Sequence, residues 1–306
     1  MNKATTLLRI KFIHPKFWPT WLVYGCMIFV THLPHKIQIN IGAFLGKLGY
    51  LLARKRRHIA EVNISLCFPS LTDQQQNDLV RQICRSSGIG LVETANSWIR
   101  DPMQLRHRVT VKGLNHLQNA IDQGRGVLLV GMHFSTLDLC GAVLSSYIGF
   151  DVMYRSNKNE LLEAIMTRGR EKNFPSALER DDIRGVLKSL KKGHAVWYGP
   201  DQDYGRKHSV FAPFFGVEAA TITATARFAK ISNSPVIFFS HYRTGDDNQY
   251  IIELSEVLQD FPSGNEVADA TLINSQIEKA INTAPEQYWW IHRRFKTRPE
   301  GEARPY

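Results

Sequence analysis

The chain has 306 residues, of which 43% are hydrophobic and 22% are charged, a composition typical of a globular protein and not of a disordered one. The formal net charge of +10 indicates an anionic partner: nucleic acid, an anionic membrane surface or a phosphorylated substrate. The cysteines have no C-x-x-C spacing, which indicates reduced thiols in a cytosolic compartment and argues against a disulfide framework or a zinc site. These residues are Cys26, Cys67, Cys84 and Cys140.

Residues 1–35 are predicted to form an N-terminal membrane anchor. The apolar stretch 17–33 lies between Pro15 and Pro34, and its length is at the lower limit of the roughly 17–25 residues that span a bilayer. Basic residues precede it and no small-residue cleavage pattern follows it, so we expect an uncleaved helix and not a signal peptide. The alternative interpretation is a buried core helix.

Residues 36–306 are predicted to form a single α/β domain with an N-terminal helical part. An apolar helix over residues 41–53 ends in the basic cluster 54–58, which we interpret as a contact with anionic lipid headgroups. Thr72 and Gln75 have the spacing of a capping box. They predict the start of a long helix that runs towards Trp98.

From residue 109 onward, short β-rich runs alternate with amphipathic helical stretches. This alternation predicts an α/β fold with a mostly parallel mixed sheet flanked by helices. The expected strands cover residues 109–111, 127–130, 151–154, 195–198, 236–240 and 250–254, and the expected helices cover residues 114–122, 136–147, 160–172, 182–191, 221–231 and 268–282.

His133 and Asp138 follow the apolar strand 127–130 at H-x-x-x-x-D spacing. On one continuous helix, residues five apart diverge by roughly 140° and do not touch. If His133 ends a strand and Asp138 lies in the first turn of the next helix, the carboxylate can fold back onto the imidazole. We therefore predict that His133 is a general base and that Asp138 orients it. The alternative is a structural histidine beside an aspartate that stabilises the helix dipole.

Other candidate residues follow neighbouring strands. Arg155 comes directly after the strand 151–154, and its guanidinium is predicted to hold an oxyanion or a phosphate. Asp201 and Tyr204 lie in the turn after the strand 195–198, and we expect them to contact substrate. Asp203 lies two residues from Asp201, but no further ligands with suitable spacing accompany this pair, so no metal site is predicted.

Phe134 and Arg293 complete the predicted site. Phe134 is expected to contact an apolar chain. The loop 211–215, with its three phenylalanines, is either core or a lipid-facing lip and is a further candidate for that contact. Arg293 lies in the segment 288–298, which mixes aromatic and basic residues. Such a segment suits the headgroup layer of a membrane. It could also stack on single-stranded nucleic acid, but no nucleic-acid-binding motif accompanies it. A serine hydrolase would need a G-x-S-x-G turn, which the sequence lacks.

At these motifs the chain resembles the late acyltransferases of lipid A biosynthesis, the lauroyl and myristoyl transferases that act on Kdo2-lipid IVA. The resemblance runs nearly end to end, through residues 14–18, 63–69, 131–138, 154–155, 197–205, 213–216 and 285–299. Many members have glutamate where this chain has Asp138. Residues 133–137 and 154–159 look closer to the lauroyl-type branch than to the myristoyl-type branch.

The resemblance implies a glycerolipid-acyltransferase-like fold and a single-pass protein of the cell inner membrane, with its active site on the cytoplasmic face. It implies an acyl-acyl-carrier-protein donor, a phosphorylated glycolipid acceptor, no metal or organic cofactor and no nucleic-acid partner. His133 would activate a hydroxyl of an acceptor hydroxyacyl chain for attack on the donor thioester. The alternatives are myristoyl or palmitoleoyl transfer or, in another class, a membrane-associated protein that binds anionic lipid or nucleic acid without chemistry.

Overall fold

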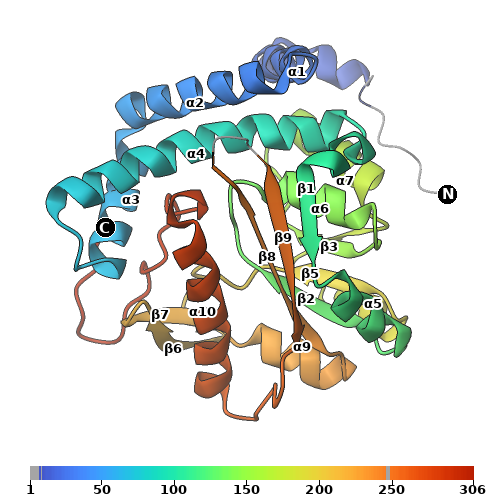
Figure 1. The fold of residues 1–306 in the computed structure, drawn as a ribbon, viewed down its shortest axis with the longest axis vertical. Coiled ribbons are helices and arrows are strands. Elements are labelled where there is room, and N and C mark those ends of the chain that lie inside the picture. Colours follow the sequence, from blue (N-terminus) through green and yellow to red (C-terminus); the bar gives the residue numbers. More distant parts are fainter. Residues whose placement is uncertain (1–6, 8, 246–248) are drawn as a thin grey trace.

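The computed structural model of the protein describes residue 7, residues 9–245 and residues 249–306. Helices cover both faces of a seven-stranded sheet, and a two-stranded hairpin lies beside it (Figure 1). The sheet strands are β1 (Val109–Lys112), β2 (Val127–Gly131), β3 (Asp151–Tyr154), β4 (Ala177–Glu179), β5 (Ala195–Tyr198), β8 (Val236–Arg243) and β9 (Tyr250–Val257). The hairpin consists of β6 (Ser209–Phe214) and β7 (Val217–Ile222).

The helical elements account for most of the remaining chain. The α-helices are α1 (Trp18–Thr31), α2 (His35–Leu52), α3 (Arg54–Cys67), α4 (Asp73–Ile99), α5 (Leu114–Asp122), α6 (Leu137–Ser145), α7 (Glu160–Asn173), α8 (Ile183–Lys191), α9 (Ala224–Ser232) and α10 (Glu266–Thr283). Short 3-10 helices are η1 (Ile10–Ile13), η2 (Pro15–Phe17), η3 (Pro102–Arg108) and η4 (Pro285–Gln287).

The sheet has the strand order β1-β9-β8-β2-β5-β3-β4. Its paired strands are parallel except for β8 and β9, which run antiparallel. The predicted α/β fold with a mostly parallel mixed sheet is therefore confirmed. Because β2 is parallel to both of its neighbours, β5 and β8, the carboxyl ends of these three strands meet at one edge. Open α/β sheets bind their ligands at such an edge.

The central strand β2 is buried at every residue. Leu128 and Val130 pack into a core on one face of the sheet, with residues from α3, α4, α9 and α10. Val127 and Leu129 pack into a second core on the opposite face, with residues from α5 and α6. A parallel strand covered on both faces needs apolar residues at successive positions, which is why the sequence here is a continuous apolar run and not an alternating one.

The predicted membrane-spanning helix is not supported. Helix α1 has 14 residues, which corresponds to about 21 Å of helix against a hydrocarbon core of about 30 Å. Pro34 stands at the N-cap of α2, so the chain starts a new helix instead of extending α1. In the described parts of the chain, no helix is both long enough and apolar enough to cross a membrane.

The N-terminal helices pack on the α/β body. Helix α2 lies along α4 (Figure 1), and glycines permit the close approach: a Cβ on Gly46 would lie 2.3 Å from the carbonyl oxygen of Cys84. Phe12 and Phe17 form a small core with Leu161 of α7. The division into an anchor of residues 1–35 and a domain of residues 36–306 stays a prediction.

Several local predictions can be compared with the structure. The capping box is confirmed at the start of α4, where the backbone N–H of Gln75 donates to Thr72 Oγ1 over 3.3 Å. The expected loop 211–215 is instead part of the hairpin β6–β7. The expected helix 221–231 begins later, at Ala224 in α9, because β7 continues to Ile222. Strand β4, at the edge of the sheet, was not predicted.

Candidate active site

His133 lies at the carboxyl edge of the sheet, two residues after the end of β2 at Gly131. A Cβ on Gly131 would lie 2.8 Å from Nε1 of Trp197 on the adjacent strand β5. Glycine at this position therefore leaves room for the Trp197 side chain. The rings of Trp197 and His133 meet edge to face, with centroids 5.8 Å apart. The strand end and this aromatic contact together fix the direction of the imidazole.

A buried carboxylate holds His133 from the neighbouring strand. Asp201 follows β5, and its Oδ1 lies 2.7 Å from His133 Nδ1. Its Oδ2 accepts a hydrogen bond from the His133 backbone N–H over 2.9 Å. The Asp201 side chain is only 1% exposed, whereas that of His133 is 31% exposed. Asp201 therefore contacts the histidine, and the predicted contact of Asp201 with substrate stays a prediction.

The pair is electrostatically coupled. Burial alone would lower the pKa of His133, but the charge of Asp201 and its hydrogen bond outweigh burial and, with a smaller contribution from the charge of Asp138, raise this pKa above its usual value. Burial likewise opposes ionisation of Asp201, yet the histidine and its backbone N–H bring the pKa of this carboxyl below its usual value. The geometry thus favours an ionised Asp201 that accepts from Nδ1–H and leaves Nε2 to accept a proton.

Two neighbouring histidines have lowered pKa values instead. Burial lowers the pKa of His241 to about 3, and its Nδ1 lies 2.8 Å from the Thr136 hydroxyl. Burial also lowers the pKa of His292 to about 4, and its Nε2 accepts from the Asp203 amide over 3.2 Å. Both rings therefore stay neutral near pH 7. Of these three histidines, His133 is the one whose surroundings favour a proton.

A cavity of about 240 Å³ opens beside His133. Its polar lining comes from His133, Asp138, Arg155 and Arg170, so the structure brings the three predicted catalytic residues to one cavity. The Asp138 carboxylate accepts from the Thr94 hydroxyl over 3.0 Å, and the carboxylate that lies against the imidazole is that of Asp201. The apolar lining includes Leu137, Phe150, Val152, Met153, Phe174 and Phe239.

Two arginines contribute the positive charge of this cavity. Arg155 is exposed at the end of β3. Arg170, on α7, has its guanidinium 4.6 Å from the ring centroid of Tyr154, and its buried Nη1 has no hydrogen-bond partner within the described structure. The sequence did not single out Arg170, because it lies in a helix among several other charged residues. Only the packing of α7 against the end of β3 reveals its position.

The remaining predicted residues lie outside the cavity. Phe134 is buried between the rings of His241 and Tyr288, so it packs in the core. Tyr204 has the Arg180 guanidinium 5.8 Å from its ring centroid: burial and the charge of Asp201 raise the pKa of its hydroxyl, while Arg180 and, to a smaller extent, Arg155 act in the opposite direction. Arg293 is exposed, and its guanidinium lies 5.9 Å from the ring centroid of Tyr306.

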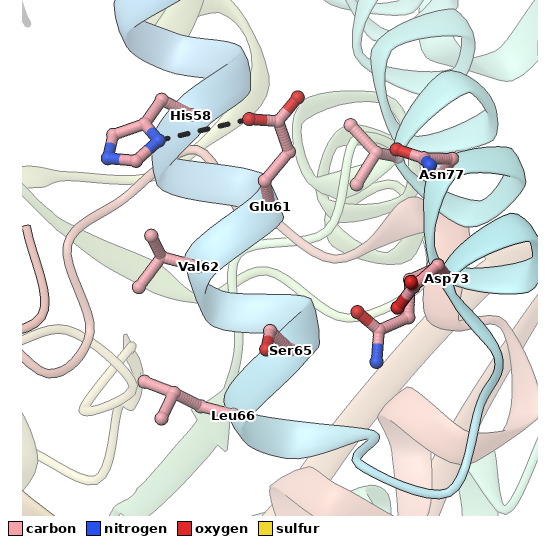
Figure 2. A pocket seen from close by; sticks show the side chains of 9 residues that line it. His58, Glu61, Val62, Ser65, Leu66, Asp73 and Asn77 are labelled. Carbon is pink, nitrogen blue, oxygen red and sulfur yellow. Dashed lines mark ion pairs between the residues drawn. The ribbon is translucent and has the colours of Figure 1, made fainter.

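A larger hollow between α3 and α4 does not have comparable chemistry. It measures about 490 Å³, and Figure 2 shows His58 and Glu61 on α3 with Asp73 and Asn77 on α4 across from them. His58 Nδ1 and Glu61 Oε2 are 3.8 Å apart, and both side chains are exposed to solvent. An exposed ion pair of this kind contributes little energy and needs no functional explanation.

Comparison with known proteins supports an enzymatic site. The family model for bacterial lipid A biosynthesis acyltransferases matches residues 7–297. The chain is 38% identical to the lipid A biosynthesis palmitoleoyltransferase of Escherichia coli (strain K12) over 97% of either chain. It is 39% identical to the lauroyltransferase of the same organism, over 94% of this chain and 95% of that protein. Identity to the corresponding myristoyltransferase is 27%, over 96% of this chain and 92% of that protein.

Replacing Asp201 by asparagine should lower the pKa of His133. The amide keeps the shape of the carboxylate but removes the charge that favours the imidazolium, while the effect of burial remains. A pH titration of the His133 ring signals by NMR would measure this change. The matched control is Asp151→Asn, because Asp151 is also a buried carboxylate beside a histidine, His194. An unchanged His133 titration in Asp201→Asn would contradict the coupling.

Proposed function

We infer the reaction from the premise that this chain belongs to the bacterial lipid A biosynthesis acyltransferases and is therefore an acyltransferase. We propose that it moves a fatty acyl chain from acyl-acyl-carrier protein to a hydroxyl of a hydroxyacyl chain on a lipid A precursor such as Kdo2-lipid IVA. The observation that carries this proposal is the His133–Asp201 pair at the mouth of a cavity with apolar walls.

In the proposed reaction His133 is the general base. Its Nε2 accepts the proton of the acceptor hydroxyl as the oxygen attacks the carbonyl carbon of the donor thioester. Asp201 holds Nδ1–H, fixes the tautomer and stabilises the imidazolium that forms. When the tetrahedral intermediate collapses, the carbon–sulfur bond breaks and the imidazolium returns its proton to the departing carrier thiolate. The products are an ester on the acceptor and a free carrier thiol.

The arginines of the cavity suit the charges that this reaction creates. Negative charge develops on the carbonyl oxygen of the thioester in the transition state, and fixed cations aimed at that oxygen accelerate the step. Arg155 and Arg170 both line the cavity that His133 enters. We propose that Arg155 stabilises the oxyanion or binds an acceptor phosphate. We propose that the negative charge of Asp138 stabilises the protonated form of His133.

We propose that the apolar part of the cavity holds the donor acyl chain. Leu137 on α6 and Phe150, Phe174 and Phe239 form its apolar walls, and burial of a chain contributes about 0.8 kcal/mol per CH₂. A closed pocket therefore favours one chain length. We propose lauroyl transfer, on the basis of residues 133–137 and 154–159. Myristoyl and palmitoleoyl transfer are the alternatives, since the lauroyl- and palmitoleoyltransferases of E. coli are similarly close to this chain.

We propose that α1 and α2 rest on the cytoplasmic face of the inner membrane. These helices form an outer layer over α4 (Figure 1), and they expose large apolar side chains: Leu22 is 70% exposed, Phe44 is 65% exposed and Leu52 is 71% exposed. The basic cluster 54–58 follows directly. An apolar helix surface flanked by cations is typical of helices that lie in the membrane interface, where the lipid acceptor resides.

His133→Ala should abolish acyl transfer while the protein still folds. Loss of a general base costs roughly 10²–10⁴-fold in rate. The measurement is release of free carrier thiol by purified protein given an acyl-carrier-protein donor and a lipid A precursor, with circular dichroism to check folding. His194→Ala, at a histidine that contacts Asp151 instead, is the matched control and should retain turnover. Near-normal turnover by His133→Ala would refute the mechanism.

Gly141→Leu should shift the donor preference towards shorter chains. Gly141 lines the cavity, and a Cβ there would lie 3.6 Å from Phe174 Cζ, so a methyl group fits whereas a leucine side chain fills part of the space. Each excluded methylene should cost roughly fourfold in competition, on the scale of 0.8 kcal/mol per CH₂. The test is competition among lauroyl, myristoyl and palmitoleoyl donors, with Gly141→Ala as control. An unchanged preference in the leucine variant would place the chain elsewhere.

The double variant Leu22→Asp/Phe44→Asp should bind vesicles of anionic phospholipid at least tenfold more weakly. Each side chain contributes about 1.5–3 kcal/mol when it leaves water, and tenfold corresponds to about 1.4 kcal/mol. Sedimentation with vesicles measures the binding. The control is Ile231→Asp/Val267→Asp, which places the same charges on exposed apolar positions of α9 and α10. Equal losses in both double variants would show that this layer is not the membrane contact.

A further inference from the structure

A second large cavity, of about 730 Å³, lies at the same carboxyl edge of the sheet. It is bounded by the first turns of α2, by the middle of α4, by η3 and by the end of β8. Cationic side chains enter it from separate elements: Lys36 from α2, Arg85 from α4, Arg108 from η3 and Arg243 from β8. Among the described residues that line it, Glu286 is the only acid.

The cations of this cavity differ in whether they have an ion-pair or hydrogen-bond partner. Arg243 is buried, and its Nη1 pairs with the Glu93 carboxylate, so its charge is neutralised locally. Lys36, Arg85 and Arg108 have neither a hydrogen bond nor an ion pair to any described residue. The N-terminal end of the 18-residue helix α2 also lies at this cavity, and the partial positive charge of a helix N-terminus favours anions. The cavity is therefore suited to a multiply charged anion.

The floor of this cavity is joined to the turn that carries His133. Ser86 Oγ accepts from Arg243 Nη2 over 2.9 Å and lies 3.0 Å from Ser135 Oγ. The Ser135 N–H donates to the carbonyl oxygen of Gln287 over 2.8 Å. Gln287 in turn bonds the N–H and the C=O of Arg243 through its side-chain amide. The turn of residues 133–136 thus separates the apolar cavity from the basic one.

We propose that the basic cavity is the subsite for a phosphate group of the acceptor glycolipid, with Lys36, Arg85 and Arg108 as its ligands. This inference rests on the proposed function. A concave, polar space suits a phosphorylated sugar, whereas a carrier protein would dock on a surface. The cavity also adjoins α2, which we place on the membrane where the acceptor resides. An acceptor held there presents its chains towards His133.

The experiment compares Arg85→Ala/Arg108→Ala with Arg184→Ala/Lys230→Ala. The control removes the same charge from exposed positions on α8 and α9 that have no ion pair in the described structure. Steady-state kinetics are measured with the phosphorylated acceptor and with the same acceptor after phosphatase treatment. We expect the first variant to raise the acceptor KM more than tenfold, because roughly tenfold is the scale of one lost hydrogen bond to a charged group and two arginines are removed, with little change in kcat. The control should behave as the parent.

The phosphatase-treated acceptor identifies the source of the effect. The parent protein should show a raised KM for it, and Arg85→Ala/Arg108→Ala should show no further rise. Equal losses on both acceptors would overturn the proposal, as would a raised KM for the donor alone, which would indicate docking of the carrier protein. Weaker binding to anionic phospholipid vesicles without a change in acceptor KM would likewise overturn it and assign these arginines to membrane headgroups.

A direct binding measurement separates this proposal from the reaction itself. Inorganic pyrophosphate, followed by ³¹P NMR line broadening, should bind the parent, the Arg184→Ala/Lys230→Ala control and the His133→Ala protein, but not Arg85→Ala/Arg108→Ala. If the parent protein binds pyrophosphate as expected but neither it nor the Arg184→Ala/Lys230→Ala control transfers an acyl chain, the proposed function fails and the anion site stands. Equal broadening by both double variants would refute the anion site.

Discussion

The burial of the Asp201 carboxylate is the constraint on which the site depends. A buried carboxylate is costly unless donors satisfy it, and both of its oxygens accept from His133. This requirement ties the turn after β5 to the turn after β2. The C-terminal segment completes the arrangement, because the Tyr288 hydroxyl donates to the Asp201 carbonyl over 3.2 Å and the Trp289 N–H donates to the His133 carbonyl over 2.9 Å. Residues far apart in the sequence therefore fix one imidazole.

Much of the sheet could be predicted because apolar runs of strand length alternate with amphipathic helices. The strand at residues 127–130 is the clearest example, since burial on both faces requires a continuous apolar run. The hairpin β6–β7 was missed because its phenylalanines gave no alternation, and Phe214 is in fact buried in the core. The predicted spanning helix is not supported, because the apolar stretch 17–33 forms only the 14-residue helix α1 before the chain starts the new helix α2 at His35.

The candidate site was only partly predictable for a related reason. His133, Asp138 and Arg155 all lie just beyond strand ends, and parallel strands bring those ends together, so their shared cavity followed from local pattern and topology. The partner of His133 Nδ1 could not be inferred in this way. Asp201 is 68 positions further along the chain, and only the pairing of β2 with β5 places it there. The H-x-x-x-x-D spacing across the strand end and the start of the next helix suggested Asp138, but Asp138 accepts from Thr94 of α4.

In the proposed mechanism, the His133 turn lies between two unlike cavities, so that a single base can serve two amphiphilic substrates. Apolar walls on one side suit an acyl chain, and cations on the other side, of which Lys36, Arg85 and Arg108 have no partner among the described residues, suit a phosphorylated sugar. The apolar cavity also contains Arg155 and Arg170, which suit the negative charge that the proposed reaction develops on the thioester carbonyl, so the two cavities differ in their walls and not in the sign of their charge. Separating them by one turn places the proposed thioester carbonyl and the acceptor hydroxyl at the boundary. The partly exposed imidazole of His133 lies at that boundary, and its pKa is set by Asp201 behind it.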